Sequence, residues 1–159
     1  MKHLFRAIAG LALFMTTALS ARAPDPADDP VAAWNADRTR PVDAAGLDLS
    51  AFQWIARPVV VFADSPNDPL FVQQMELLAE RAEELALRDV VVIFDTDPAA
   101  RSNIRLDLRP RGFMLTLVGK DGQVRARKPR PWDVRELSRS IDKMPMRQQE
   151  MRDRRGTDR

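Results

Sequence analysis

Two short apolar runs rich in β-branched residues constrain the fold of this chain more than any other feature. They span residues 58–63 and 90–94, and each has the length and composition of a strand that is buried on both faces. Between them, residues 69–87 carry apolar side chains at helical spacing, and Asp68 followed by Pro69 is a typical helix start. Because the connections are short, this order predicts a parallel β-α-β unit with a right-handed crossover.

The following part of the chain predicts two more strands and a closing helix. Residues 113–118 form a third apolar run, residues 119–122 are typical of a hairpin turn, and residues 124–127 alternate between apolar and basic side chains. A last apolar stripe at helical spacing lies within residues 131–144, and Pro145 is expected to end that helix. With a weak helical signal before the third run, the fold class is an α/β sandwich of order β-α-β-(α)-β-β-α with a mixed central sheet.

The first 23 residues have the pattern of a secretory signal peptide. Lys2 and Arg6 supply positive charge, an apolar stretch follows, and small residues allow cleavage after Ser20 or Ala23. The apolar stretch is shorter than the ~20 residues that a bilayer-spanning helix needs. We therefore expect an exported protein, periplasmic or secreted, with no transmembrane segment after cleavage.

Composition divides the remaining chain into three parts. Residues 24–48 are rich in Pro, Asp and Ala and are expected to form a flexible linker. Residues 49–145 hold the predicted elements, and residues 146–159 are expected to be a polar tail. The net charge is −7 over residues 24–119 and +6 over residues 120–159. Because acids are interspersed in the basic part, it is expected to be a solvated surface, with no nucleic-acid partner.

Several classes of chemistry are excluded by the residues that the chain lacks. It has no cysteine and one histidine, His3, which lies in the predicted signal peptide. Disulfides, thiol redox chemistry, thiolate metal sites and histidine-based triads are therefore excluded for the mature chain. Phosphate-binding loops and nucleophile elbows are absent as well. We expect no cofactor.

The order of the elements resembles the core of the thioredoxin-like fold. Residues 59–64 are similar to the strand that enters the redox loop of that family, and residues 113–124 are similar to its closing hairpin. Where thioredoxins carry Cys-x-x-Cys, this chain has Ser-Pro-Asn-Asp-Pro at residues 65–69, and the position of the family's cis-proline falls near Met114. The resemblance implies the fold without the redox activity.

Short motifs between about residues 49 and 151 carry a second resemblance. They are Phe52 and Trp54 before Arg57-Pro58, the run to Phe62-Ala63, Asp89 to Val92, Gly112-Phe113 with the turn at 119–122, and Ile141 to Arg147. These motifs resemble the uncharacterised bacterial family called domain of unknown function 4174. The family name implies no activity.

Carboxylates are predicted to gather at one edge of the sheet. Asp64 follows the first strand, and Asp95 and Asp97 follow the second. The carboxyl ends of parallel strands share an edge that ligands favour. Oxygen ligands there would suit Mg²⁺ or Ca²⁺. The other interpretation is that Asp and Asn are simply the usual residues of turns that end strands.

Basic side chains precede the third apolar run. They either bind an anionic ligand or pair with nearby aspartates. The four arginines are Arg101, Arg105, Arg109 and Arg111.

These observations predict a non-redox binding or interaction module of the bacterial envelope, with an envelope protein as its partner. The expected ligand or partner surface comprises Asp64, Ser65, Asn67, Asp95, Asp97 and Arg105. The alternative is an enzyme that uses Asp64, Asp95 and Asp97 with a divalent cation. A third interpretation is a structural envelope protein whose polar tail docks on anionic surfaces. The sequence leaves the oligomeric state open.

Overall fold

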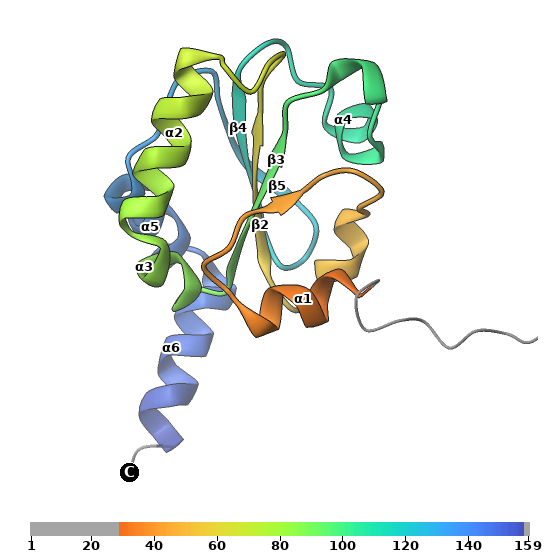
Figure 1. Ribbon diagram of the computed structural model, residues 1–159. Helices are drawn as coiled ribbons and strands as arrows, with labels where there is room; N and C mark the ends of the chain where they lie inside the picture. Colours follow the sequence, from red (N-terminus) through yellow and green to blue (C-terminus); the bar gives the residue numbers. More distant parts are fainter. Residues whose placement is uncertain (1–28, 158–159) are drawn as a thin grey trace, which may run out of the picture.

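The computed structural model describes residues 29–157 and contains a five-stranded sheet (Figure 1). The predicted signal peptide lies outside the described residues. In the sheet the strands stand in the order β1-β3-β2-β4-β5. The strands are β1 (Val42–Asp43), β2 (Arg57–Phe62), β3 (Val90–Asp95), β4 (Met114–Val118) and β5 (Val124–Lys128).

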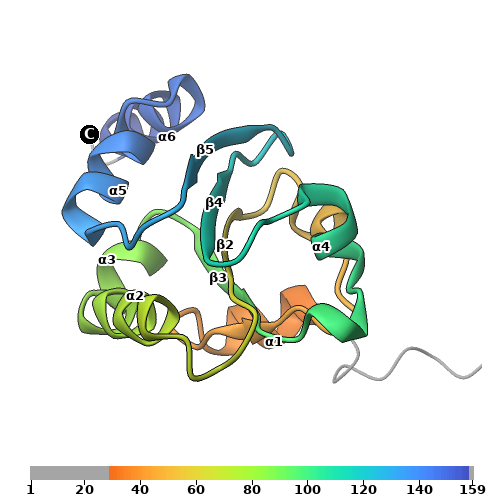
Figure 2. The same cartoon turned by 90° about the horizontal axis from the view of Figure 1, so that it is seen from above.

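Helices cover both faces of this sheet (Figure 2). They are α1 (Pro30–Ala36), α2 (Pro69–Glu80), α3 (Ala82–Ala86), α4 (Asn103–Leu108), α5 (Val134–Asp142) and α6 (Pro145–Thr157), with the short 3₁₀ helices η2 (Leu49–Phe52) and η3 (Pro98–Ala100). One face carries α2, α3 and α5, and the other carries α1 and α4. No helix within the described part of the chain is long and apolar enough to cross a membrane.

The directions of the strands are mixed, as the sequence predicts. β2 is parallel to β3, with Val60 opposite Ile93, and α2 and α3 form the crossover between them. β4 is antiparallel to β2, and β5 is antiparallel to β4 at the edge of the sheet. This topology is that of the thioredoxin-like fold, and it confirms the predicted fold class.

The side chains of β2 alternate between two hydrophobic cores. Val59 and Val61 pack with α2, α3 and α5, whereas Val60 and Phe62 pack with α1, η2 and α4. All six residues of β2 are buried. The prediction of a strand buried on both faces is therefore confirmed.

The predicted helix over residues 69–87 is divided in two. Asp68 caps α2 by accepting hydrogen bonds from the backbone N–H groups of Leu70 and Phe71, as predicted. At Arg81 the backbone leaves the helical region, with φ −133° and ψ 33°, and α3 begins at the next residue. The interruption keeps the predicted apolar stripe on one side, because Leu78 and Leu85 are buried in the same core.

The end of the chain is helical where a polar tail is predicted. Pro145 begins α6 instead of only ending the helix before it, because proline lacks an N–H that the first turn of a helix would leave unpaired anyway. Arg147 on α6 is 7% exposed. The first turns of α6, up to residue 151, therefore pack on the folded domain, which corrects the predicted boundary at residue 145, whereas residues 152–157 are exposed.

Residues 29–48 are ordered where the sequence predicts a flexible linker. Asp29 caps α1, and β1 pairs with β3 at the edge of the sheet. Trp34 on α1 is 1% exposed, and its ring meets that of Phe52 edge-on at 6.3 Å between centroids. The correction has a physical reason: the Asp and Pro residues that resemble loop signals are a helix cap and the first helical residue.

Replacing Trp34 with Ala tests whether this segment contributes to stability. We expect the free energy of unfolding in urea to fall by about 3–5 kcal/mol, because a large buried side chain is lost from the core. Trp54→Ala is the matched control, since Trp54 is 63% exposed, and it should change the unfolding free energy by about 0.5 kcal/mol or less. Equal effects of the two substitutions would contradict the packing of residues 29–48.

Candidate functional site

The polar side chains predicted at the carboxyl ends of β2 and β3 meet on one buried aspartate. Asp95 is 5% exposed. Its Oδ1 accepts hydrogen bonds from Arg105 Nε at 3.0 Å and Nη2 at 2.7 Å, and its Oδ2 accepts one from Ser102 Oγ at 2.5 Å. Burial acts to raise the pKa of Asp95, but the hydrogen bonds from Arg105 and Ser102 outweigh it and hold that pKa below its usual range. Asp95 is therefore ionised at neutral pH.

Arg105 ties the ends of the two parallel strands together. It lies on α4, where Ser102 Oγ accepts its backbone N–H at 3.1 Å. Its Nη2 donates to the backbone oxygens of Ala63, directly after β2, at 2.8 Å and of Asp95 at 3.0 Å. Its Nη1 lies 3.7 Å from Oδ1 of Asp64, whose side chain is 65% exposed. Of the two interpretations of this arginine, the structure shows pairing with nearby aspartates.

The other predicted site residues form local turns. Ser65 Oγ accepts the backbone N–H of Asn67 at 3.2 Å. Asp97 caps η3 by accepting the N–H groups of Ala99 at 2.9 Å and Ala100 at 3.3 Å. Three of the six predicted residues therefore meet, and the other three shape the turns beside them.

This arrangement does not favour a divalent cation. The guanidinium group of Arg105 bridges Asp95 and Asp64, and so it takes the place that a shared cation would need. The Asp97 carboxylate is used as a helix cap. Across residues 29–157, no group of three His, Cys, Asp or Glu side chains gathers in a geometry that would hold a metal ion. The geometry thus offers no support for the cation-dependent alternative.

The loop after β2 lacks redox chemistry. Residues 65–68 lead from β2 to α2, which is the position of Cys-x-x-Cys in thioredoxins, and the sequence contains no cysteine. Thiol–disulfide exchange by this chain is therefore excluded.

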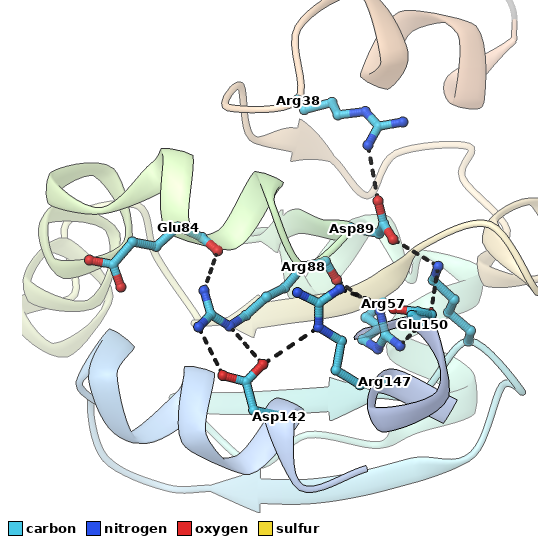
Figure 3. A network of polar contacts seen from close by, with 9 residues as sticks. Arg38, Arg57, Glu84, Arg88, Asp89, Asp142, Arg147 and Glu150 are labelled. Carbon is cyan, nitrogen blue, oxygen red and sulfur yellow. Dashed lines mark hydrogen bonds and ion pairs between the residues drawn. The ribbon is translucent and has the colours of Figure 1, made fainter. Parts of the chain in front are cut away.

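A second polar cluster, which sequence reasoning missed, lies at the opposite end of the parallel strands, where β2 and β3 begin (Figure 3). We call this end the amino edge. Its centre is Glu150 on α6. The Oε1 atom of Glu150 lies 2.8 Å from Arg57 Nη2 and 3.0 Å from Lys120 Nζ, and its Oε2 accepts a hydrogen bond from Arg147 Nη1 at 3.2 Å. Burial acts to raise the pKa of Glu150, but the hydrogen bonds from Arg57 and Lys120 outweigh it and lower that pKa to about 2.

Further ion pairs extend this cluster to the segment after α1 and to the end of α5. Lys120 Nζ lies 2.8 Å from Asp89 Oδ2, and Asp89 Oδ1 lies 3.0 Å from Arg38 Nη1 in the segment between α1 and β1. On the other side, Asp142 at the end of α5 accepts two hydrogen bonds from Arg88, at 3.1 and 2.9 Å. We call these residues, together with Arg57, Arg147 and Glu150, the amino-edge network.

The sequence carries little signal for this network. Arg57 and Glu150 are 93 residues apart, and neither lies in a motif with fixed spacing. Arg57 directly precedes the apolar run of β2 and is typical of a strand boundary, yet it is 1% exposed. Its place inside a recognised family motif was the one available hint.

Comparisons with known proteins assign the family. The sequence profile of the family described as "Domain of unknown function (DUF4174)" matches residues 48–150. The chain belongs to this family. The matched DUF4174 region begins at the N-cap of η2 and ends at Glu150, so it contains both polar clusters except Arg38.

Two known proteins are similar to parts of this chain. Coiled-coil domain-containing protein 80 of Danio rerio is 29% identical over 133 residues, which cover 65% of this chain and 15% of that protein. The DUF4174 chain thus spans less than a sixth of that relative. A solved structure, the mitochondrial 2-cys peroxiredoxin of Plasmodium falciparum, aligns with a TM-score of 0.40 and 17% identity over 60% of this chain and 79% of that chain. The strand order carries the fold assignment.

An exposed tryptophan lies beside the amino-edge network of this DUF4174 domain. Trp54 has φ 65°, and its N–H donates to the backbone oxygen of Lys120 at 2.7 Å. A left-handed conformation costs a bulky residue about 1–2 kcal/mol. Ile55 beside it is 43% exposed. Trp54 and Ile55 thus form a pair of exposed apolar side chains at this edge.

Replacing Glu150 with Gln tests the charge cluster through pH. Because the folded pKa of Glu150 is about 2 and its usual value is 4.5, the ionised carboxylate stabilises the fold above pH 4.5, and this contribution is lost as the pH falls toward 2. The shift corresponds to at most about 3 kcal/mol. We expect the unfolding free energy, measured in urea, to fall more steeply with acid in the wild type than in Glu150→Gln.

The control for this measurement is Glu76→Gln, because Glu76 is exposed on α2. Its pH profile should follow that of the wild type. Parallel profiles for Glu150→Gln and the wild type would contradict the lowering of the Glu150 pKa by its three cationic neighbours.

A thermal melt with Mg²⁺, Ca²⁺ or EDTA tests the carboxyl edge. A ligand that binds only the folded state raises the Tm. Because Arg105 already bridges Asp95 and Asp64, we expect equal Tm values in EDTA and in millimolar Mg²⁺ or Ca²⁺. A saturable rise in Tm that Asp95→Asn abolishes would restore the cation hypothesis.

Proposed function

We propose that this chain is an exported, non-redox binding module of the bacterial envelope, and that it contacts a protein partner through the loop formed by residues 64–70. The export step of this proposal rests on the signal-peptide pattern of residues 1–23. The observation that carries the binding step is a loop whose base is fixed and whose tip is exposed.

The base of the loop is held from both sides. Before it, Ala63 donates its N–H to the backbone oxygen of Asp95 at 2.9 Å and accepts a hydrogen bond from Arg105 Nη2 at 2.8 Å. After it, Asp68 caps α2. A loop that is already ordered loses little conformational entropy when it binds, so more of the contact energy remains as affinity.

The tip of the loop presents both apolar and polar groups. Pro66, Asn67 and Pro69 are exposed, and Leu70 is 39% exposed. The side chain of Asp64 is 65% exposed beside them. Two prolines and a leucine provide apolar area, while Asn67 and Asp64 provide polar groups that fix orientation, and this mixture is typical of non-obligate protein interfaces.

Mild cross-linking in a native envelope extract tests this surface. Tagged wild-type protein and Asn67→Ala/Leu70→Ala are captured in parallel, and the bound proteins are identified by mass spectrometry. These two side chains are exposed, so the double variant should keep the wild-type Tm. We expect a partner of the wild type to be depleted about tenfold or more with the variant, since interface anchors carry most of the binding energy.

Trp54→Ala/Ile55→Ala is the matched control at the opposite edge, because it also removes two exposed side chains. This control should retain the partner. Loss with the control alone would overturn the loop as the contact surface. Equal recovery by all three proteins, or no specific partner for the wild type, would overturn the binding proposal.

A further inference from the structure

The amino-edge network contains more positive than negative charge (Figure 3). In this network, as far as the structure describes it, five cationic side chains contact three carboxylates. Partly buried charges are normally paired, because an unpaired charge away from water is costly. Counted over this network, the side chains carry a surplus of positive charge, although Arg38 is itself 43% exposed. The cations are Arg38, Arg57, Arg88, Lys120 and Arg147, and the carboxylates are Asp89, Asp142 and Glu150.

A cavity of about 170 Å³ opens beside Arg57 and Lys120 of this network. Three of its lining side chains are basic, namely Arg57, Lys120 and Arg125, and residues 144–146 close it where α6 begins. Its volume is that of roughly six water molecules. It is smaller than the roughly 300–1,000 Å³ of pockets for drug-sized ligands. The cavity thus suits a small inorganic anion with little room for an organic substituent.

The basic side chains around the cavity keep donors to spare. Arg57 has five N–H donors, and within residues 29–157 its acceptors are the backbone oxygen of Arg88 at 2.9 Å and the Glu150 carboxylate at 2.8 Å. Lys120 has three donors and contacts two carboxylates, those of Asp89 and Glu150. Lys120, whose side chain is 11% exposed, is therefore able to donate a further hydrogen bond into the cavity, whereas Arg57, at 1% exposed, contributes mainly its positive charge.

A glycine allows the third basic side chain to reach the cavity. At Gly119 in the hairpin turn, an added Cβ would lie 2.5 Å from Asp121 Oδ1 and 3.0 Å from Arg125 Nε. Arg125 and Asp121 form an ion pair across this space. Asp121 is the carboxylate among the lining residues, and it neutralises part of the positive charge there.

We propose that this cavity binds a tetrahedral dianion of the phosphate or sulfate class. Three basic groups from different segments surround it: Arg57 from β2, Lys120 from the hairpin turn and Arg125 from β5. Guanidinium groups match the oxygen geometry of such anions and bind them with charge-assisted hydrogen bonds. The cavity lining carries three cations and one carboxylate, and this positive balance favours an anion. This site lies at the opposite edge from the loop of residues 64–70 and does not depend on the proposed partner.

Calorimetric titration of the purified full chain with sodium phosphate and sodium sulfate, at fixed ionic strength set by chloride, tests the site. Glycerol phosphate is a third titrant, which distinguishes a free anion from a phosphate monoester. We expect saturable binding of phosphate or sulfate to the wild type, and weaker binding of the monoester because the cavity is small. A matching rise in Tm should accompany binding. Monoester binding tighter than that of both free anions would overturn the assignment to a small inorganic anion.

Three variants make the test specific. Arg125→Ala removes an exposed lining cation and should weaken binding about tenfold, as expected for the loss of one charge-assisted hydrogen bond. Asp121→Asn removes the negative charge at the cavity and should strengthen binding. Arg152→Ala is the matched control, because Arg152 is an exposed arginine of α6 that bonds to Gln149 and does not line the cavity. No saturable binding by the wild type, or equal affinities for Arg125→Ala and Arg152→Ala, would overturn the proposal.

Discussion

A buried arginine at the start of the central strand governs the amino edge of this domain. Arg57 is 1% exposed, and a charge removed from water costs several kcal/mol unless it is well paired. Its partners are the backbone oxygen of Arg88, in the turn before β3, and the carboxylate of Glu150 on α6. The last helix therefore supplies the counter-charge of this buried arginine when it docks on the sheet. Removing α6 would leave the guanidinium group of Arg57 without its counter-charge.

The two edges of the sheet differ in how their charges are balanced. At the carboxyl edge the half-buried Arg105 pairs with the buried Asp95 and lies near the exposed Asp64, and these contacts fix the base of a loop. At the amino edge several cations share few carboxylates beside a small cavity. The first arrangement favours rigid presentation of a surface, and the second favours capture of an anion. Neither needs the thiol chemistry that the same fold supports in thioredoxins.

The local chemistry of the chain explains which elements were predictable. Continuous apolar runs predicted β2, β3 and β4, because strands that are buried on both faces are apolar along their whole length. Asp68-Pro69 was recognised as a helix start, yet Asp29-Pro30 and Asp97-Pro98 are the same signal and begin α1 and η3. The signal was overlooked at residues 29–30 because the surrounding composition is typical of a linker. Trp34 is the large apolar side chain of that segment, and its burial packs α1 against the core.

The candidate sites also differ in how far the sequence predicted them. Asp64 and Asp95 were predictable neighbours, because the carboxyl ends of parallel strands meet by geometry alone. The ion pairs of Glu150 with Arg57 and Lys120 were not predictable. They depend on how α6 packs on a strand and a hairpin turn that are distant in sequence. Residue type also says nothing about which of many charged side chains is buried. Since the cavity exists only where α6, the hairpin turn and β2 converge, anion binding there would stabilise the docked helix, and loosening α6 would weaken the anion site by the same free energy.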